Sequence, residues 1–193
     1  MEPAQLRATI ASAQAGSAEA YEALLETYGP RLYGYFVRAT GSHHDAEDLS
    51  GEMALRLVQR LRHYDDRGRF EPWLFRIAAN LVRDRIRRSR VWPRQLSLSS
   101  DSDDTGPLAE RLAAAEEDVE ARMLAAEASA GLDEAIARLD ARTRHMLLLR
   151  HFAPLSFREI ADLFDCPLGT VLARVHRGLK ALRRLMGDSD ETE

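Results

Sequence analysis

The residues best suited to chemistry are a row of cations with one amide, spaced as neighbours on one side of a helix. At about 100° per residue, the segment 73–88 gathers four polar side chains in a narrow stripe: Arg76, Asn80, Arg83 and Arg87. Guanidinium groups bind phosphate oxygens, and an amide hydrogen-bonds to a base or to a nucleic-acid backbone. The stripe therefore predicts non-covalent binding of a nucleic acid.

The other side of this segment is apolar and predicts how the stripe is held. Five side chains share that side: Leu74, Ile77, Ala78, Leu81 and Val82. A helix with such a face packs on its own domain and presents the cations outward. One basic stripe alone is more often plain solvated surface, so the prediction gains weight only if the chain carries a second one.

Two residues of this segment have more than one interpretation. Trp73 is most simply a core residue or a lid at the start of the helix, although an aromatic ring can also stack on an unpaired base. From the sequence pattern alone we favour the core role. Asp84 lies at helical spacing from Arg87 and Arg88, so we expect it to orient these cations.

A second basic helix is predicted over residues 167–186. Its expected buried stripe consists of Val171, Val175, Leu179 and Leu182, and its polar face of Thr170, Ala173, Arg174, Arg177, Lys180 and Arg184. The helix follows a capping box at Ser156 and Glu159, a short helix ending near Phe164, and a turn at Asp165. Short helix, tight turn and long helix predict a helix-turn-helix, whose second helix enters a major groove.

The charges are segregated along the chain. The formal net charge is -4, yet residues 73–94 hold seven arginines and one acid, and residues 167–186 hold five cations and no acid. Between them, residues 97–140 hold twelve acids and three arginines. The local field, not the net charge, steers a polyanion, so two separate basic patches are expected to meet nucleic acid.

The coarse organisation is all-α, with two helical domains joined by a flexible acidic linker. We expect domains at 1–94 and 117–193 and the linker at 95–116, where polar and acidic residues lose helical periodicity. The expected helices are Glu19–Ala39 with an interruption near Gly29–Pro30, Asp45–Leu61, 73–89, Leu108–Leu139 weakened at Gly131, and Ala141–His151 capped by Asp140. Pro167 suits the first position of the final helix.

Several classes of protein are disfavoured. The single cysteine, Cys166, allows no internal disulfide and no cysteine-based zinc site, and we expect it to pack in the turn. Residues 1–16 do not form a signal peptide, and no apolar run is long enough to span a membrane. These observations predict a soluble cytoplasmic protein with no membrane insertion.

A group of histidines and acids suggests at first a metal site: His43, His44, Asp45, Glu47, Asp48 and Glu52. Adjacent histidines rarely point at one ion, and acids at a helix N-terminus are explained by the helix dipole. We therefore expect no metal and no cofactor. The sequence also lacks a glycine-rich phosphate loop, a nucleophilic triad and a paired-carboxylate arrangement, so no enzymatic activity is expected.

The motifs also carry a resemblance to a known family. The chain resembles the sigma-70 family of bacterial RNA polymerase initiation factors, in its extracytoplasmic-function (ECF) group. The resemblance rests on Asp45–Leu49, on Pro72–Leu81 with Asp84 and the arginine run, and on Leu155–Ala161 with Gly169–Val171, Arg174, His176 and Arg177. It covers roughly residues 18–92 and 118–186.

The resemblance implies a role for each basic helix. The N-terminal domain, which resembles the family's region 2, would melt the -10 promoter element, and the loop 62–70 would receive an extruded base. The residues implied are Arg62, His63, Tyr64, Trp73, Arg76, Asn80, Arg83, Asp84, Arg87 and Arg88. The C-terminal domain, which resembles the family's region 4, would bind the -35 duplex through Ser156, Thr170, Ala173, Arg174, Arg177 and Lys180. Two residues, Leu172 and Ala173, stand where the family commonly has Lys and Ser.

The resemblance also implies partners. Core RNA polymerase would bind the helix that carries Asp45, Glu47, Asp48, Glu52, Arg56 and Gln59, the acidic linker would thread toward the RNA path, and an anti-sigma factor would hold the protein inactive. Gly51 stands where the family usually has Gln, and Ala54 where it has a bulkier apolar residue. Gly51 weakens the helix by up to ~1 kcal/mol relative to Ala.

Two alternatives remain open at this level. One is a conventional helix-turn-helix regulator, which binds duplex DNA without polymerase and usually dimerises on paired half-sites. The basic helix at 73–88 argues against it, because such a regulator needs no strand-opening helix. The other is an enzyme that uses the His43 cluster, which metal analysis would test.

Overall fold

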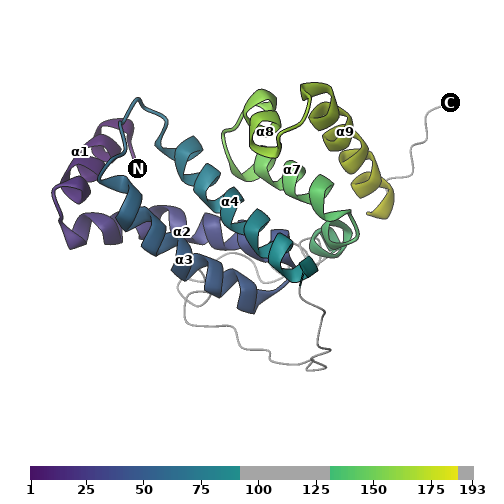
Figure 1. Cartoon of the computed structure of the whole chain (residues 1–193), viewed down its shortest axis with the longest axis horizontal. Helices are drawn as coiled ribbons and strands as arrows, with labels where there is room; N and C mark the ends of the chain where they lie inside the picture. The colour runs from purple at the N-terminus through teal and green to yellow at the C-terminus, as the bar shows by residue number, and fades with distance from the viewer. Residues whose placement is uncertain (92–130, 187–193) are drawn as a thin grey trace, which may run out of the picture.

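The computed structural model describes residues 1–91, here called the N-terminal half, and residues 131–186, the C-terminal half (Figure 1). The regular elements within these two ranges are helices, as predicted. They are α1 (Pro3–Gln14), α2 (Ala18–Thr40), α3 (His43–Leu61), α4 (Phe70–Val91), α7 (Ala141–Phe152), α8 (Phe157–Phe164) and α9 (Leu168–Leu185), and residues 131–137 are helical as well. The predicted linker at 95–116 and most of the helix predicted at 108–139 lie outside the described residues.

Helix α2 runs without a break from Ala18 to Thr40, so the predicted interruption near Gly29–Pro30 is wrong. A proline inside a helix costs about 3 kcal/mol or more. Large side chains of α2 are buried on both sides of Pro30: Leu24, Tyr28, Leu32, Tyr35 and Phe36. Each contributes roughly 1.5–3 kcal/mol when fully buried, so tertiary packing outweighs the local penalty.

Helix α3 confirms its predicted pattern. Its buried residues are the five on the predicted line: Ala46, Leu49, Met53, Leu57 and Leu61. The helix begins at His43, two residues earlier than predicted, because the Ser42 side chain accepts a hydrogen bond from the Asp45 amide and caps it. The opposite side of α3 faces outward. It carries the acidic residues for which the resemblance implies contact with core RNA polymerase.

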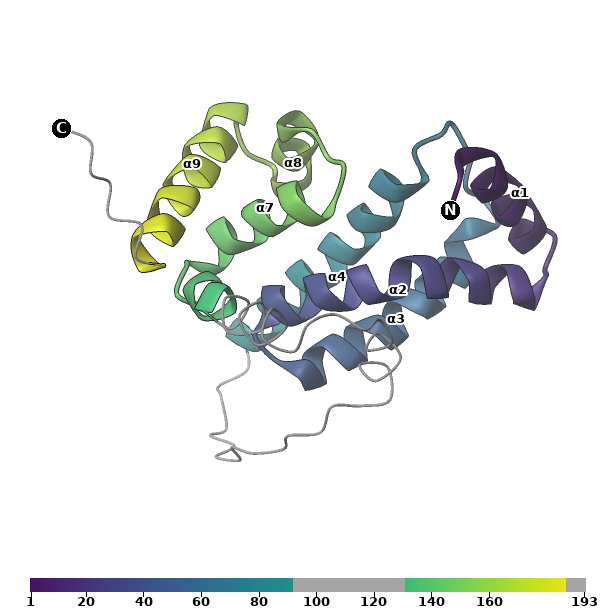
Figure 2. The same ribbon diagram turned by 180° about the vertical axis from the view of Figure 1, so that it is seen from behind.

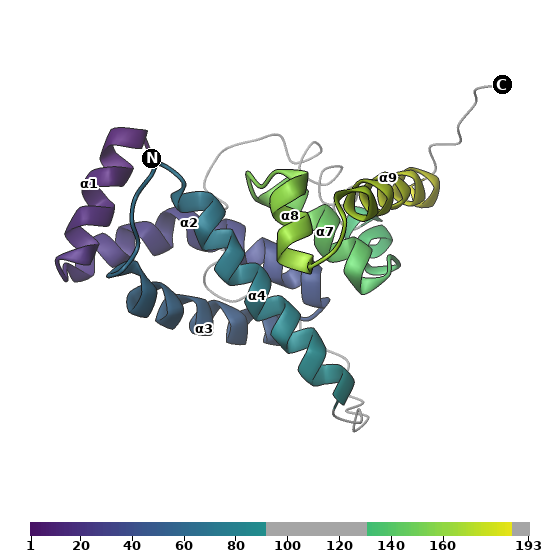
Figure 3. The same cartoon turned by 45° about the horizontal axis from the view of Figure 1, so that its top comes forward.

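Helix α4 lies across α2 and α3 and begins at Phe70, three residues earlier than predicted (Figure 3). All five predicted apolar residues are buried. Phe75 and Ala79 are buried as well, which the sequence did not indicate. The Phe75 ring meets the Tyr35 ring edge-on at 6.0 Å between centroids, because α2 covers a second side of α4.

Local capping shapes the C-terminal half as predicted. The Asp140 side chain accepts from the Thr143 amide at the start of α7, and Ser156 with Glu159 forms a capping box on α8. Asp165 closes α8 in a left-handed conformation with φ 48°, and Cys166 is half-buried in the turn. Pro167 occupies the N-cap of α9, so the helix itself begins one residue later than predicted.

The buried stripe of α9 differs from its prediction at one position. Val171, Val175 and Leu182 are buried, but Leu179 is 45% exposed and Gly178 takes its place. A Cβ at Gly178 would lie 2.9 Å from the Thr143 Cγ2 and 3.1 Å from a methyl of Leu147. The glycine thus allows α9 to approach α7 closely, which shifts the stripe away from Leu179.

The two halves pack against each other, chiefly through α2 and α7 (Figures 1 and 2). The Tyr35 hydroxyl hydrogen-bonds to His145 Nε2 in the buried centre of this contact. At its edge, Arg38 Nε donates to Asp133 Oδ1 at 2.7 Å. Two helical domains were predicted, but this contact between them was not, because nothing local in the sequence encodes it.

Two glycine-to-alanine substitutions should change stability in opposite directions. Gly178→Ala is expected to destabilise the fold by about 1–3 kcal/mol, because the new Cβ would lie 2.9 Å from the Thr143 Cγ2 and 3.1 Å from a Leu147 methyl. Gly51→Ala is expected to stabilise it by about 0.5–1 kcal/mol, because Gly51 lies inside α3 with open space around its Cα. Urea unfolding of both variants measures this, and a shift of the same sign in both would contradict the packing described for α9.

Candidate nucleic-acid interface

The predicted stripe on α4 exists as one exposed face. Arg76, Arg83 and Arg87 are exposed, and Asn80 is half-buried between them. Arg83 Nη2 donates to Asn80 Oδ1 at 2.8 Å, which leaves the Asn80 amide nitrogen as the group free to point outward. Asp84 lies 3.4 Å from Arg87 Nη2, so its predicted orienting role is confirmed geometrically. The Arg88 Nε donates to the Asp84 backbone carbonyl at 3.4 Å.

An aromatic group closes the N-terminal end of this stripe. The Trp73 ring lies 4.5 Å from the Tyr64 ring and 5.6 Å from the Phe70 ring, measured between centroids. Trp73 is half-buried and Phe70 fully buried, so Trp73 acts as a lid rather than as a core residue. Burial, then the neighbouring Asp66, raises the pKa of Tyr64 to about 12, which keeps its hydroxyl a donor.

The connection 62–69 between α3 and α4 is held to α1 at its start and is largely exposed further along. Gln14 donates to the carbonyls of Leu61 and Tyr64 at 3.0 and 2.7 Å. Further on, the Gly68 amide donates to Asp66, with φ +72° at the glycine. Arg62 and His63 are exposed. A hollow of about 900 Å³ lies beneath the connection, lined among others by Arg7, Tyr28, Arg31, Gly68 and Arg69.

The stripe on α4 also touches α8 of the C-terminal half. Arg69, just before α4, donates to Glu159 Oε1 at 2.6 Å, and Arg76 lies 3.7 Å from the same oxygen. Arg83 Nη1 donates to the Leu163 carbonyl at 2.6 Å. These contacts were not predicted, because they join residues that are far apart in the chain. Two cations of the α4 stripe, together with Arg69 just before the helix, are thus paired with one short helix.

The polar face of α9 is largely open. Ala173, Arg177 and Lys180 are exposed, and Thr170 is half-buried. Arg174 is held inward, because its Nη1 donates to Asp140 Oδ1 at 3.2 Å and to Thr143 Oγ1 at 3.1 Å. Ser156 stands at the start of α8, where its hydroxyl donates to Glu159 at 2.8 Å. Of the predicted residues, Arg177 and Lys180 are therefore the most available cations.

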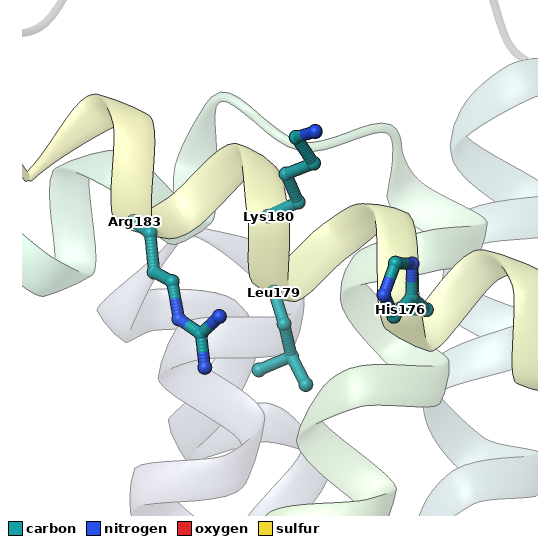
Figure 4. Close-up of a pocket in the computed structure, with 4 residues that line it drawn as sticks. All are labelled: His176, Leu179, Lys180 and Arg183. Carbon is teal, nitrogen blue, oxygen red and sulfur yellow. The ribbon is translucent and has the colours of Figure 1, made fainter. Parts of the chain in front are cut away.

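An apolar side chain lies among the cations of α9. Figure 4 shows Leu179 and Arg183 extending to one side of the helix and Lys180 to the other. Together with His176 these residues line a shallow hollow of about 270 Å³. Leu172 is likewise exposed on this helix. Helix α9 therefore presents methyl groups as well as cations.

The outward face of α3 is a mixed polar and apolar surface. Its predicted polar residues lie there, namely Asp45, Glu47, Asp48, Glu52, Arg56 and Gln59. Arg56 donates to Glu52 at 2.8 Å, and Arg85 of α4 donates to both Asp45 and Asp48. Leu55 is 65% exposed and Val58 40% exposed on this face. The sequence reasoning missed these two, although their position off the buried line of α3 was the available signal.

The histidines near the start of α3 do not converge with other ligands in the described ranges. The His43 ring shares a hydrogen bond with the Tyr33 hydroxyl at 3.0 Å, and His44 lies 4.0 Å from Asp48. Within residues 1–91 and 131–186, no three His, Cys, Asp or Glu side chains come together as ligands would. In the same ranges, no helix has the length and apolarity that crossing a membrane requires.

Comparison with known proteins identifies the class. The description "Sigma-70 region 2" matches residues 24–91, and "Sigma-70, region 4" matches residues 129–182. These are a helical domain carrying the α4 stripe and a helix-turn-helix domain. The order of the two matches along the chain is the order in which the two basic helices occur.

Curated relatives give the same result over nearly the whole chain. The ECF RNA polymerase sigma factor SigW of Bacillus subtilis is 29% identical over 185 residues, which are 95% of this chain and 97% of that protein. The RNA polymerase sigma-H factor of Pseudomonas aeruginosa is 30% identical and shares 90% and 89% of the two chains. SigD, an ECF sigma factor of Mycobacterium tuberculosis, is 31% identical over 95% and 84% of the two chains.

Solved structures share the fold. The sigma factor RpoE in complex with the anti-sigma factor NepR, from Bartonella quintana, aligns with a TM-score of 0.62 at 20% identity, over 89% of this chain and 98% of that one. CnrH in complex with the cytosolic domain of CnrY aligns with a TM-score of 0.59 at 22% identity, over 96% and 98%.

The chain belongs to the sigma-70 family of RNA polymerase sigma factors, in its ECF group. The alternative of a standalone helix-turn-helix regulator is therefore not supported, because such a regulator has no region 2. Sigma factors as a family are polymerase specificity factors rather than enzymes, which also disfavours an enzyme built on the His43 cluster.

Stability should fall as the pH decreases from about 6.5 toward 3, because of His145. Burial, and then the charge of Arg83, lowers the pKa of His145 from its ordinary 6.5 to about 3. The folded chain keeps this histidine neutral while the unfolded chain binds a proton, so in this window the unfolded state gains protons and stability is lost with acid. We expect a loss of about 2 kcal/mol between pH 7 and pH 5 from this group.

The variant His145→Gln isolates this contribution, because glutamine keeps a partner for Tyr35 but does not titrate. Urea unfolding at both pH values measures the free energies of the natural chain and the variant. The natural chain should lose about 2 kcal/mol more than the variant. An equal loss in the two proteins would show that His145 is not held neutral in the fold.

Proposed function

We propose that this chain is a promoter-specificity subunit that binds bacterial core RNA polymerase in the cytoplasm and directs it to a set of promoters. The observation that carries the proposal is the α4 stripe. Three exposed arginines flank one amide on a helix whose other side is buried, in a chain that also carries a helix-turn-helix. The polymerase supplies the chemistry, and the chain itself contributes binding energy and no catalysis.

The N-terminal domain, which we assign to residues 1–94, melts the -10 element. Arg76, Arg83, Arg87 and Arg88 hold the phosphates of the separating strand, with Asp84 positioning the last two. Asn80 meets an opened base through its outward amide nitrogen. Trp73 and Tyr64, whose rings lie tilted against each other, offer an aromatic surface beside Arg62 and His63, and the hollow under the connection has room for an extruded base.

The C-terminal domain, which we assign to residues 117–193, binds the -35 duplex. The N-terminal half of α9 enters the major groove, where Thr170 and Arg174 read bases once Arg174 leaves Asp140. Arg177, Lys180 and Ser156 contact phosphates, and Ala173 and Leu172 present methyl groups to the groove. The intervening residues 95–116 serve as the acidic linker that threads the polymerase.

The outward face of α3 is the proposed contact for core polymerase. Its acids and Arg56 form a polar rim around exposed Leu55 and Val58. An apolar centre within a charged rim is typical of protein–protein interfaces. Arg85 of α4 ties down Asp45 and Asp48, which pre-organises this face before binding.

An anti-sigma factor is the proposed inhibitory partner. Two of the solved structures with this fold are complexes with a second protein. In one, the sigma factor RpoE is bound to the anti-sigma factor NepR, and in the other, CnrH is bound to the cytosolic domain of CnrY. Exposed apolar side chains on α9, such as Leu172 and Leu179, give such a partner a surface to cover.

The direct test is transcription with purified components. The chain is added to core RNA polymerase and a genomic promoter library, and run-off transcripts are sequenced. We expect transcripts that depend on the added chain and share -35 and -10 sequences. The absence of both polymerase binding and transcripts that depend on the added chain would refute the proposal. Binding to a palindromic duplex without polymerase would instead favour a conventional helix-turn-helix regulator.

Replacing Asn80 with Ala should impair melting more than duplex binding. The amide contacts a base only after the strands separate, so open-complex formation should fall by on the order of tenfold, the effect of one or two lost hydrogen bonds. Binding of the polymerase complex to duplex promoter should change by less than about twofold. Permanganate reactivity of the -10 thymines and a mobility-shift assay measure the two steps.

The matched control for this experiment is Gln5→Ala, which removes an exposed amide from α1, away from the stripe. It should leave both steps unchanged. Weaker duplex binding by Asn80→Ala, with normal melting of the DNA that is bound, would refute the role given to Asn80.

A further inference from the structure

We propose that Gln14, the last residue of α1, is a positioning residue for the site that receives an extruded -10 base. Its side-chain amide holds the connection 62–69, and through that connection it holds the aromatic pair Tyr64 and Trp73. This role rests on the proposed function of the connection and extends that site to α1. The match to sigma-70 region 2 begins at residue 24, so α1 lies outside the matched range.

The Gln14 amide group donates two hydrogen bonds to the connection. Gln14 Nε2 donates to the Leu61 carbonyl at 3.0 Å and to the Tyr64 carbonyl at 2.7 Å. Leu61 is the last residue of α3, where a helix leaves carbonyl groups without partners of its own. The Tyr64 amide also donates to the Leu61 carbonyl, at 3.0 Å. One side chain therefore ties the end of α3 and the first turn of the connection to α1, and Figures 1 and 3 show the connection running past that helix.

The core of the N-terminal half fixes the direction in which Gln14 points. Ile10 and Ala13 of α1 are fully buried. Gln14 lies four residues after Ile10, so the two side chains share one side of the helix. Helix α1 ends at Gln14, and Gly16 then turns the chain with φ +99°. The half-buried amide is thus presented from a packed helix and not from a free arm.

Further contacts carry this anchoring along the connection. The Tyr64 hydroxyl donates to Asp66 Oδ1 at 3.3 Å, and the Gly68 amide donates to the same oxygen at 2.9 Å. The Tyr64 ring lies 4.5 Å from the Trp73 ring between centroids. Tyr64 is therefore held through its backbone by Gln14 and through its side chain by Asp66. The cover over Trp73 depends on where these two bonds place the Tyr64 ring.

Helix α1 also lines the hollow proposed for the base. Leu6 and Arg7 of α1 and Gly68 and Arg69 of the connection are among the residues around this space of about 900 Å³. Gln14 joins the two segments that provide these residues. Loss of its hydrogen bonds should change the fit of a base between them. The cations of the α4 stripe, which are proposed to hold the strand backbone, do not depend on Gln14.

Two substitutions of similar side-chain length remove the hydrogen-bond donors. Gln14→Met has no donor, and Gln14→Glu presents a carboxylate that only accepts. Both new residues are good helix formers, so α1 is retained. The controls are Gln5→Met and Gln5→Glu, because Gln5 is exposed on the same helix. Circular dichroism and urea unfolding verify that all four full-length variants fold.

The first measurement is made on the free protein and needs no DNA. Trp92→Phe is introduced into every protein, so that Trp73 is the single tryptophan of the chain. Acrylamide quenching of its fluorescence then reports how well the ring is covered. We expect both Gln14 variants to raise the quenching constant about twofold, because lost hydrogen bonds shift a local equilibrium toward open forms. The Gln5 controls should match the natural chain.

The second measurement uses the chain bound to core polymerase. Fluorescein-labelled single strands carry the -10 sequence of a promoter found in the run-off experiment, with the base at each position varied in turn. Fluorescence anisotropy gives their affinities. We expect the Gln14 variants to lower discrimination between bases about fivefold at the extruded position, the effect of roughly one lost hydrogen bond. Discrimination elsewhere and affinity for core polymerase should match the Gln5 controls.

Folded Gln14 variants that match the Gln5 controls in base discrimination would refute the positioning role, whether or not quenching changes. An equal loss of affinity at every position, together with weaker polymerase binding, would refute it as well, because it would show general destabilisation. A natural chain that gives no transcripts with core polymerase would instead overturn the proposed function. The quenching measurement would in that case still decide whether Gln14 holds Tyr64 against Trp73.

Discussion

The packing of α4 against α2 and α3 is the constraint on which the rest of this molecule depends. Leu74, Ala78, Leu81 and Val82 are all buried, and they fix the rotation of the helix about its axis. Because rotation is fixed, Arg76, Asn80 and Arg83 have only one direction in which to point. A change in the core of the N-terminal half therefore moves the whole stripe at once, while a change in the stripe leaves the core intact.

The same cations can pair with either of two electronegative partners. In the structure they meet the Glu159 carboxylate and the Leu163 carbonyl of α8, and in the proposed function they meet phosphates of a separated strand. Exposed ion pairs contribute little individually, typically 0–1 kcal/mol, so neither partner need be permanent. Apolar contact between α2 and α7, with the buried Tyr35–His145 hydrogen bond, also holds the two halves together, so separating them depends on a balance of several modest interactions.

The features that could be predicted from the sequence depend on residues that lie close together in the chain. The buried line of α3, the apolar side of α4 and the caps at Asp140 and Ser156 all depend on residues within four positions of one another, and the structure has them where periodicity and capping rules place them. The candidate stripe was predictable for the same reason, since a basic face is the complement of an apolar one.

The rest was decided by neighbours distant in sequence. Pro30 stays inside α2 because large side chains of the same helix are buried on either side of it, such as Tyr28 and Leu32, and Leu179 is exposed because Gly178 lets α7 approach. Arg174 is turned toward Asp140, thirty-four residues away in the chain, and not outward as its helix position predicts. Leu55 and Val58 are exposed apolar residues off the buried line of α3, and a prediction for that face based on polar side chains does not include them.

The central claim is that the stripe of α4 binds the melted -10 strand of promoter DNA, and a cryo-electron microscopy structure of the chain with core polymerase and an open promoter tests it most directly. The account predicts that Arg76 and Arg83 lie on the backbone of the melted -10 strand, with Asn80 beside an unpaired base. It also predicts that Glu159 and the Leu163 carbonyl have left them and that α8 lies near the -35 duplex. An open complex in which α8 still rests on α4, or in which the strand passes elsewhere, would contradict it.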